Sequence, residues 1–203
     1  MITSFPIKRC AKRLLVFLLL LVLAMAFYVV HVLAHDNFHV VSAGQVYRSG
    51  QMSASTLGRV IREHGIKCVL NLRGANPEQA WYPAETNTAA QLGVRHLDFS
   101  LSAGREVSDP EIDAIMELVR RAPKPILIHC YGGADRTGLI SSLYLYTIEE
   151  KTSVEASREL TAFYGHIPHL HWRYSIAMDH SFWRYVSNRL SQMEMKAIPL
   201  KGQ

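Results

Sequence analysis

The feature that most constrains the fold is a short apolar run, Pro125–His129 (PILIH), followed by a loop over residues 130–136 and a second apolar stretch with helical character. A strand that is apolar at nearly every position, rather than at every second one, is typical of the middle of a parallel sheet, where both faces are buried. We therefore expect a sheet that is covered by helices on both sides.

Strand and helix candidates alternate along the rest of the chain. The best-marked helix starts at Asp109, because Ser108 and Glu111 have capping-box spacing and Pro110 lies in the first turn. This alternation predicts an α/β fold with a central, mostly parallel sheet flanked by helices. The candidate strands are 45–48, 66–72, 94–99 and 125–129. The other candidate helices are 53–64, 83–92, 137–149, 154–163 and 175–192.

Residues 14–34 carry no charged side chain and follow a basic segment, 1–13. At a rise of about 1.5 Å per residue, such a helix can cross a hydrocarbon core of about 30 Å. We expect one N-terminal transmembrane helix (a signal-anchor) with residues 1–13 in the cytoplasm and the domain on the extracytoplasmic, periplasmic side. Ala24–Ala26 (AMA) resembles a cleavage site, so a cleaved signal peptide and a secreted periplasmic form are the alternative.

The remaining divisions follow from these features. Residues 35–44 are interpreted as a connector, 45–190 as one domain and 191–203 as a C-terminal tail.

The net charge of +5 is concentrated before the apolar run, and no acidic residue precedes Asp36. We therefore expect no nucleic-acid partner. Three cysteines are too few for a disulfide framework, although a reversible disulfide between Cys68 and Cys130 stays open.

Cys130 follows the central strand, and active sites in such sheets lie at the carboxyl ends of strands. The glycine pair in the next positions lets amide N–H groups crowd together, and the following helix adds its positive dipole end. This loop is expected to bind a phosphate group above the thiolate of Cys130, which can then attack the phosphorus in line. The guanidinium of Arg136 is expected to donate hydrogen bonds to two of the phosphate oxygens. Thr137 is expected to donate to the departing sulfur, and His129 to support the loop. The predicted phosphate-binding residues are Tyr131, Gly132, Gly133, Ala134, Asp135 and Arg136.

The segment 129–137, HCYGGADRT, resembles the His-Cys-x2-Gly-x2-Arg-Ser/Thr signature of the cysteine-dependent protein tyrosine phosphatases. Residues 46–53 (VYRSGQMS) and 65–74 (GIKCVLNLRG) are similar to the smaller, dual-specificity-like members, and residues 133–138 (GADRTG) are similar to their atypical bacterial and fungal branches. The resemblance covers residues 45–165. It implies hydrolysis of a phosphate monoester through a phosphocysteine, with no metal and no cofactor.

The leaving group needs a proton, which this family usually takes from an aspartate on a loop upstream of the cysteine. Asp98 lies at a suitable distance, whereas Asp109 more plausibly serves a helix N-terminus. Asp135, inside the loop, is the second candidate, as in the myotubularin lipid phosphatases and certain bacterial tyrosine phosphatases, unless it only orients a neighbouring arginine. Glu106 is a third. The sequence leaves Asp98 and Asp135 open as general acid.

Other side chains near the predicted site have two interpretations each. Arg48 and Arg73 can meet substrate phosphate, although ordinary salt bridges are the simpler role. Trp81 and Tyr82 either wall the pocket or pack beside it. The histidines of the segment GHIPHLHWRY permit a metal site, but a surface location is favoured because no carboxylate or cysteine completes the set locally. These histidines are His166, His169 and His171.

The expected activity is that of a dual-specificity or tyrosine protein phosphatase, acting on a phosphorylated protein. A membrane phospholipid or a phosphosugar is the alternative substrate, because the predicted anchor holds the site near a bilayer. A phosphate-binding module with weak catalysis is an alternative of another class. A rhodanese-type sulfur transferase also uses a strand, a cysteine loop and a helix, but its loop does not usually close on Arg-Thr-Gly.

Overall fold

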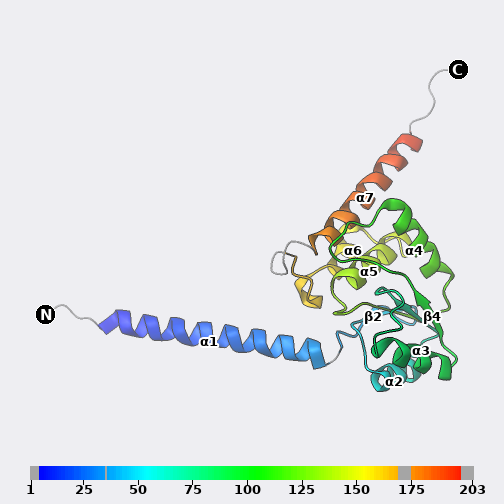
Figure 1. Ribbon diagram of the computed structural model, residues 1–203. Coiled ribbons are helices and arrows are strands. Elements are labelled where there is room, and N and C mark those ends of the chain that lie inside the picture. The colour runs from blue at the N-terminus through cyan, green and yellow to red at the C-terminus, as the bar shows by residue number, and fades with distance from the viewer. Residues whose placement is uncertain (1–4, 35, 169–174, 198–203) are drawn as a thin grey trace. The chain divides into compact units, whose positions relative to one another are not determined.

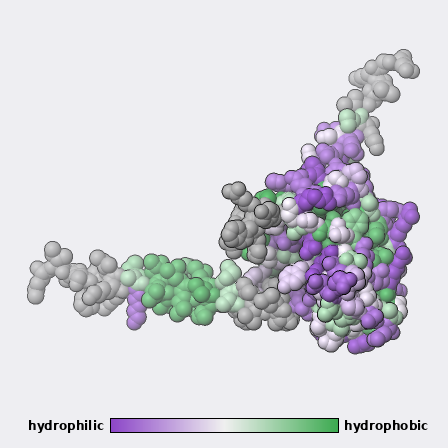
Figure 2. Space-filling view, viewed as in Figure 1, coloured by the Kyte–Doolittle hydropathy of each residue, from purple (hydrophilic) through white to green (hydrophobic). Residues whose placement is uncertain are grey.

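The computed structural model describes residues 5–34, 36–168 and 175–197, and the chain divides into two units, Met1–His35 and Asp36–Gln203. The first unit contains helix α1 (Phe5–Ala34). Figure 2 shows an apolar surface along α1, to which exposed side chains from Leu14 to Met25 contribute. Among the described residues, no helix combines the length and the apolar character needed to cross a membrane. The transmembrane helix predicted at 14–34 is therefore not confirmed, and export of the domain stays a prediction.

The second unit is built on a five-stranded mixed sheet in the order β1-β2-β5-β3-β4. Strand β1 pairs with β2 in antiparallel fashion, and the other pairs are parallel. The α/β class with a mostly parallel sheet is confirmed, and β5 is its central strand, as the apolar run indicates. The segment predicted as a connector, 35–44, contains β1. The strands are β1 (His39–Ser42), β2 (Val46–Ser49), β3 (Cys68–Asn71), β4 (Arg95–Asp98) and β5 (Ile126–His129).

Helices cover both faces of this sheet, with α2 and α3 on one side and α4, α5 and α7 on the other (Figure 1). Leu127 packs with the apolar side chains of α2, whereas Ile126 and Ile128 join the larger core against α4, α5 and α7. Cys130 belongs to that larger core too. The helices are α2 (Ala54–His64), α3 (Trp81–Gln91), α4 (Asp109–Arg121), α5 (Asp135–Thr147), α6 (Ser153–Ala156) and α7 (Ile176–Ala197), with 3-10 turns η1 (Ser157–Glu159) and η2 (Ala162–Tyr164).

The ends of the helices follow their capping residues where those signals are local. Ser53 caps α2, and Ser108 with Glu111 forms the capping box of α4. The largest differences from the predicted limits lie near the C-terminal end. Helix α7 runs to Ala197, past the predicted end at residue 192, and the helix predicted at 154–163 is replaced by α6 and the two 3-10 turns. The backbone oxygen of Glu159 accepts a hydrogen bond from Arg48 at 2.9 Å, so contact with the sheet takes the place of a continuous helix here.

Candidate functional site

The loop over residues 130–136, which we call the Cys130 loop, connects the central strand to α5 at the carboxyl end of the sheet. Gly133 has φ +68, and a Cβ at this position would lie 2.5 Å from the amide nitrogen of Gly50. A side chain would therefore clash with the turn after β2, in addition to straining the backbone. The absence of a side chain at Gly133 allows the loop to pack directly against that turn.

The carbonyl oxygens of the Cys130 loop point outward, into the surrounding protein. Each of the four oxygens from Tyr131 to Ala134 accepts a hydrogen bond from a backbone or side-chain donor. These contacts fix the orientation of the peptide planes in the loop. The bonds are Gln51 N to Tyr131 O at 3.0 Å, Asn37 Nδ2 to Gly132 O at 3.0 Å, Arg48 Nη2 to Gly133 O at 2.7 Å and Gly138 N to Ala134 O at 2.9 Å.

The amide groups of the loop consequently face the other way, because a trans peptide places N–H and C=O on opposite sides. Across the part of the chain that the structure describes, no amide of residues 131–134 donates to a backbone or side-chain acceptor. The first amides of α5 also have no partner inside the helix. The loop and helix together therefore offer a ring of main-chain donors of the kind that binds a tetrahedral oxyanion.

Arg136 lies in the first turn of α5 and points to the same end of the sheet. Its Nη1 donates to the backbone oxygens of Leu101 at 3.2 Å and Leu72 at 3.4 Å. Its Nε is buried and has no hydrogen-bond partner among the described residues. A buried donor without an acceptor is costly. A phosphate oxygen would supply the missing acceptor.

Cys130 is buried, with 3% of its surface exposed, and both it and Cys68 are free thiols. Cys68 pairs in register with Ile126, four residues before Cys130 along the neighbouring strand. At about 3.3 Å per residue, this offset separates the two cysteines by about 13 Å along the strand, whereas a disulfide needs Cα atoms within about 7 Å. The disulfide is therefore excluded in this structure. Burial raises the pKa of Cys68 to about 11, as for a small core residue.

Glu85 of α3 holds His129 beneath the loop. His129 contacts Glu85 Oε1 through Nε2 at 3.0 Å and lies 3.3 Å from the oxygen of Cys130 through Nδ1. Burial alone would raise the pKa of Glu85, but hydrogen bonds from His129 and His96 outweigh it and hold the pKa well below its usual range. The sequence did not single out Glu85. No local pattern marks it, since its partner His129 is 44 residues away.

Asp98, one candidate acid, lies at the end of β4, which β3 separates from β5. Its Oδ1 accepts from Asn71 at 2.7 Å, and its Oδ2 accepts from the Tyr82 hydroxyl at 2.6 Å. The hydrogen bond to Asp98 raises the pKa of Tyr82 to about 12. Both carboxylate oxygens of Asp98 are thus engaged by donors.

Asp135, the other candidate, contacts a histidine. His166 Nδ1 lies 2.6 Å from Asp135 Oδ1, and His166 Nε2 lies 2.8 Å from Asp179 Oδ2 on α7. Burial by itself would lower the pKa of His166, but the two carboxylates outweigh it and raise the pKa to about 9. His166 is buried, and the expected surface location is wrong for this residue. His169 and His171 lie outside the described residues.

The other predicted residues take positions around the loop. Arg48 is buried, pairs with Glu159 Oε2 at 2.5 Å and lies 3.8 Å from the Tyr164 ring, so it supports the loop from behind. The Thr137 hydroxyl donates weakly to Ser49 O at 3.5 Å. Glu106 pairs with Arg184 of α7. Among the described residues, no group of three histidine, cysteine or acidic side chains is arranged to hold a metal.

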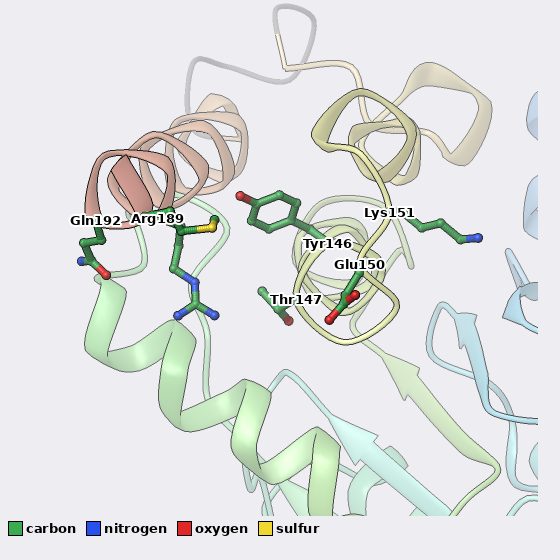
Figure 3. Close-up of a pocket in the computed structure, with 7 residues that line it drawn as sticks. Tyr146, Thr147, Glu150, Lys151, Arg189 and Gln192 are labelled. Atoms are coloured by element: carbon green, nitrogen blue, oxygen red, sulfur yellow. The ribbon is translucent and has the colours of Figure 1, made fainter. Parts of the chain in front are cut away.

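A cavity of about 490 Å³ lies elsewhere, between α7 and the carboxyl end of α5 (Figure 3). Helix α5 begins in the Cys130 loop and is 13 residues long. At about 1.5 Å per residue, the cavity lies about 20 Å from the loop. The convergent donors and the thiol lie at the loop, so the cavity is not part of the candidate active site. The cavity is lined by Tyr146, Thr147, Glu150, Lys151, Arg189, Gln192 and Met193.

Comparison with known proteins identifies relatives of this fold. Residues 25–170 match a family model described as a DSP-PTPase phosphatase fused to NAD+ kinase. Comparison with curated proteins finds no significant match. The core catalytic domain of the PP-IP phosphatase SIW14 from S. cerevisiae has 22% identity and a TM-score of 0.59, with 82% of this chain and 97% of that chain covered.

Two further solved structures are similar. P. aeruginosa TpbA has 22% identity and a TM-score of 0.54, covering 74% of this chain and 91% of its own, and a TpbA variant has been solved in complex with pTyr. PTPMT1 has 13% identity and a TM-score of 0.55, covering 76% of this chain and 99% of its own. At these identities the structural likeness establishes the fold.

Proposed function

This chain belongs to the family of DSP-PTPase phosphatases, which are cysteine-based hydrolases, and on that premise we propose that it hydrolyses phosphate monoesters through a phosphocysteine on Cys130. The proposed substrate is a phosphorylated protein, as for a dual-specificity or tyrosine phosphatase. The complex of TpbA with pTyr supports this choice. A phosphate ester of a lipid or a sugar is the alternative, and the description of SIW14 as a PP-IP phosphatase supports a non-protein substrate.

The observation that carries the proposal is the orientation of the Cys130 loop. Its carbonyl oxygens are bonded to the surrounding protein and its amides are unpaired among the described residues. These amides and the orphaned Nε of Arg136 can bind the three non-bridging phosphate oxygens. Charge accumulates on these oxygens in phosphoryl transfer, so donors placed there stabilise the transition state.

The proposed reaction has two displacement steps. In the first, the Cys130 thiolate forms an S–P bond, the ester O–P bond breaks, and the leaving oxygen takes a proton from a general acid. In the second, water attacks phosphorus, the S–P bond breaks, the electron pair returns to sulfur and inorganic phosphate is released. The base form of the same side chain accepts the proton of the attacking water.

We assign the general acid to Asp135. A carboxyl group that donates a proton needs one oxygen that no other donor occupies. Both oxygens of Asp98 accept hydrogen bonds, from Asn71 and Tyr82. Only Oδ1 of Asp135 is engaged, by His166, and its Oδ2 has no hydrogen-bond partner among the described residues. Asp135 also lies at the first position of α5, directly beside Arg136.

Hydrolysis of p-nitrophenyl phosphate tests the proposal. The wild-type chain should release p-nitrophenol, and Cys130→Ser should reduce kcat by at least about 10³-fold, because an alcohol is a far weaker nucleophile than a thiolate. Cys68→Ser is the matched control, since it removes a buried thiol remote from the loop, and it should retain turnover. Equal activity in wild type and Cys130→Ser would refute the phosphocysteine route.

A further inference from the structure

Arg73 places a further guanidinium at the Cys130 loop, besides Arg136 and Arg48. It follows β3, and its Cζ lies 3.7 Å from the ring centroid of Trp81 and 5.3 Å from that of Tyr131. Tyr131 is the residue after Cys130. The only hydrogen bond from the Arg73 side chain to a described residue is from Nη1 to Gln51 Oε1, at 3.0 Å. Arg73 is thus held against the loop by two aromatic rings and one amide.

Within the part of the chain that the structure describes, the charge of Arg73 has no direct counterion. Among the described residues, none of the ion pairs includes Arg73, whereas Arg48, which lies in β2, is paired with Glu159. Burial lowers the pKa of Arg73, and the positive charge of Arg136 lowers it further, against smaller opposing effects from Glu85, Cys130 and Tyr131. Arg136 Nη1 donates to the backbone oxygen of Leu72, the residue before Arg73, so the two arginines meet at the same end of the sheet. An anion between the two arginines would remove their mutual repulsion.

The way Arg73 is held leaves donors available. Stacking on Trp81 uses the face of the guanidinium, and the N–H groups lie in its plane. A guanidinium has five N–H donors, of which one is used by Gln51. The remaining edge is planar and rigidly placed, and such an edge suits two oxygens of a phosphoryl group.

We propose that Arg73 binds a second phosphoryl group of the substrate, beside the phosphate that is cleaved at Cys130. The inference rests on the proposed function and narrows its substrate class to compact esters that carry two phosphoryl groups close together. In this arrangement Arg136 and the loop amides hold the reacting group. Arg73 binds the second phosphoryl group, and this contact adds binding energy that is not available to a monophosphate.

Arg73 also has a simpler possible role, as a brace that positions Gln51 and Tyr131. The two roles predict different results. If Arg73 only positions Gln51 and Tyr131, its loss disturbs the loop and weakens the binding of every phosphate-like ligand by a similar factor. If Arg73 forms a second anion site, its loss weakens the binding only of ligands that carry two phosphoryl-like groups.

The experiment compares two inhibitors of p-nitrophenyl phosphate hydrolysis by the full chain. Methylphosphonate carries one phosphonate group and methylenediphosphonate carries two, and neither is hydrolysed. We expect the wild type to bind the diphosphonate about tenfold more tightly, the effect of one charge-assisted contact. In Arg73→Gln the ratio of the two inhibition constants should fall to near one, and Arg73→Lys should give a value in between. Arg120→Gln, at an exposed site on α4, is the matched control and should keep the wild-type ratio.

Two results would overturn the inference. One is a wild-type chain that binds both phosphonates equally, and the other is an Arg73→Gln variant in which both weaken by the same factor. Absence of hydrolysis in the wild type would instead count against the proposed function. In that case, direct calorimetric titration of both phosphonates into the wild type and Arg73→Gln measures the same ratio, so the failures of the two proposals can be told apart.

Discussion

The surroundings of a residue, more than its type, decide its role at this site. Arg48 lies in β2 and Arg73 lies just after β3, and from the sequence alone the two arginines have the same pair of interpretations. In the structure Arg48 is fully buried and bonded to Glu159 and to the oxygen of Gly133. Arg73 has no such counterion among the residues that the structure describes. Arg48 therefore fixes the shape of the Cys130 loop, whereas Arg73 is available to the ligand that the loop binds.

Replacement of Arg48 should cost stability. Arg48→Met leaves the carboxylate of Glu159 buried without its partner, and breaking one side of a buried pair costs about 3 kcal/mol of unfolding free energy. Urea unfolding followed by circular dichroism measures this loss. Arg59→Met, which breaks an exposed pair with Glu63, should cost less than about 1 kcal/mol. Equal losses in the two variants would contradict a supporting role for Arg48.

The assignment of the general acid is also a prediction about single residues. Asp135→Asn should lower kcat by about 10²-fold for an alkyl phosphate, whose leaving group needs a proton, and much less for p-nitrophenyl phosphate. Asp98→Asn should have a small effect on both substrates, since Asp98 mainly receives hydrogen bonds from Asn71 and Tyr82. Steady-state kinetics with both substrates decides the matter. A large effect of Asp98→Asn on the alkyl substrate alone would assign the acid to Asp98.

At the scale of elements, His166 connects the start of α5 to α7 through Asp135 and Asp179. The sequence signals that succeeded are local ones: Ser53 and Ser108 mark the starts of α2 and α4 because a cap acts on the next few residues. The role of His166 could not be predicted in this way, because Asp135 is 31 residues from it. Strand β1 was missed for the same reason. It is defined by pairing with β2 and not by its own four residues.

The contact between α5 and α7 should depend on pH. The pKa of His166 is about 9 in the folded chain, above its ordinary value of 6.5, so folding favours the protonated form. Its contribution to stability is complete below pH 6.5 and is lost as the pH rises through 9. The full contribution is on the order of 3 kcal/mol.

Unfolding by urea at pH 6 and pH 9.5 measures this dependence. The wild type should lose stability between the two values, and His166→Gln should lose markedly less, because glutamine does not titrate. Tyr185→Phe, which removes a different contact of α7, to Asp113, is the control and should keep the wild-type slope. The same pH dependence in wild type and His166→Gln would show that His166 is not the titrating group.

For the molecule as a whole, the order of the strands explains why the central strand and the place of the candidate site could be predicted from the sequence. The apolar run of β5 identifies the central strand, and a central parallel strand places its following loop at the active edge. The family signature then supplies the chemistry. The domain start could not be read from the sequence, since residues 35–44 carry no strong strand pattern. Their role depends on contacts with distant parts of the chain, among them Asn37 with Gly132.

The domain boundary gives a test at this scale. A chain of residues 36–203 keeps Asn37 and β1, so it should hydrolyse p-nitrophenyl phosphate within about twofold of the full chain. A chain of residues 45–203 loses the Asn37 bonds to the oxygens of Gly132 and Tyr164 and the edge strand, and its kcat/KM should fall by at least about tenfold, the loss expected for about two hydrogen bonds. Equal activity of the two truncated chains would mean that this segment does not order the loop.

The most direct test of the account is a titration of inorganic phosphate into ¹⁵N-labelled Cys130→Ser, followed by NMR. The backbone amides of Gly132, Gly133 and Ala134 should shift downfield together with one dissociation constant, because they donate to the same anion. Arg136→Lys in the same background should weaken that constant. If these three amides stay unchanged at saturating phosphate, the loop does not cradle an oxyanion and the proposed chemistry at Cys130 is wrong.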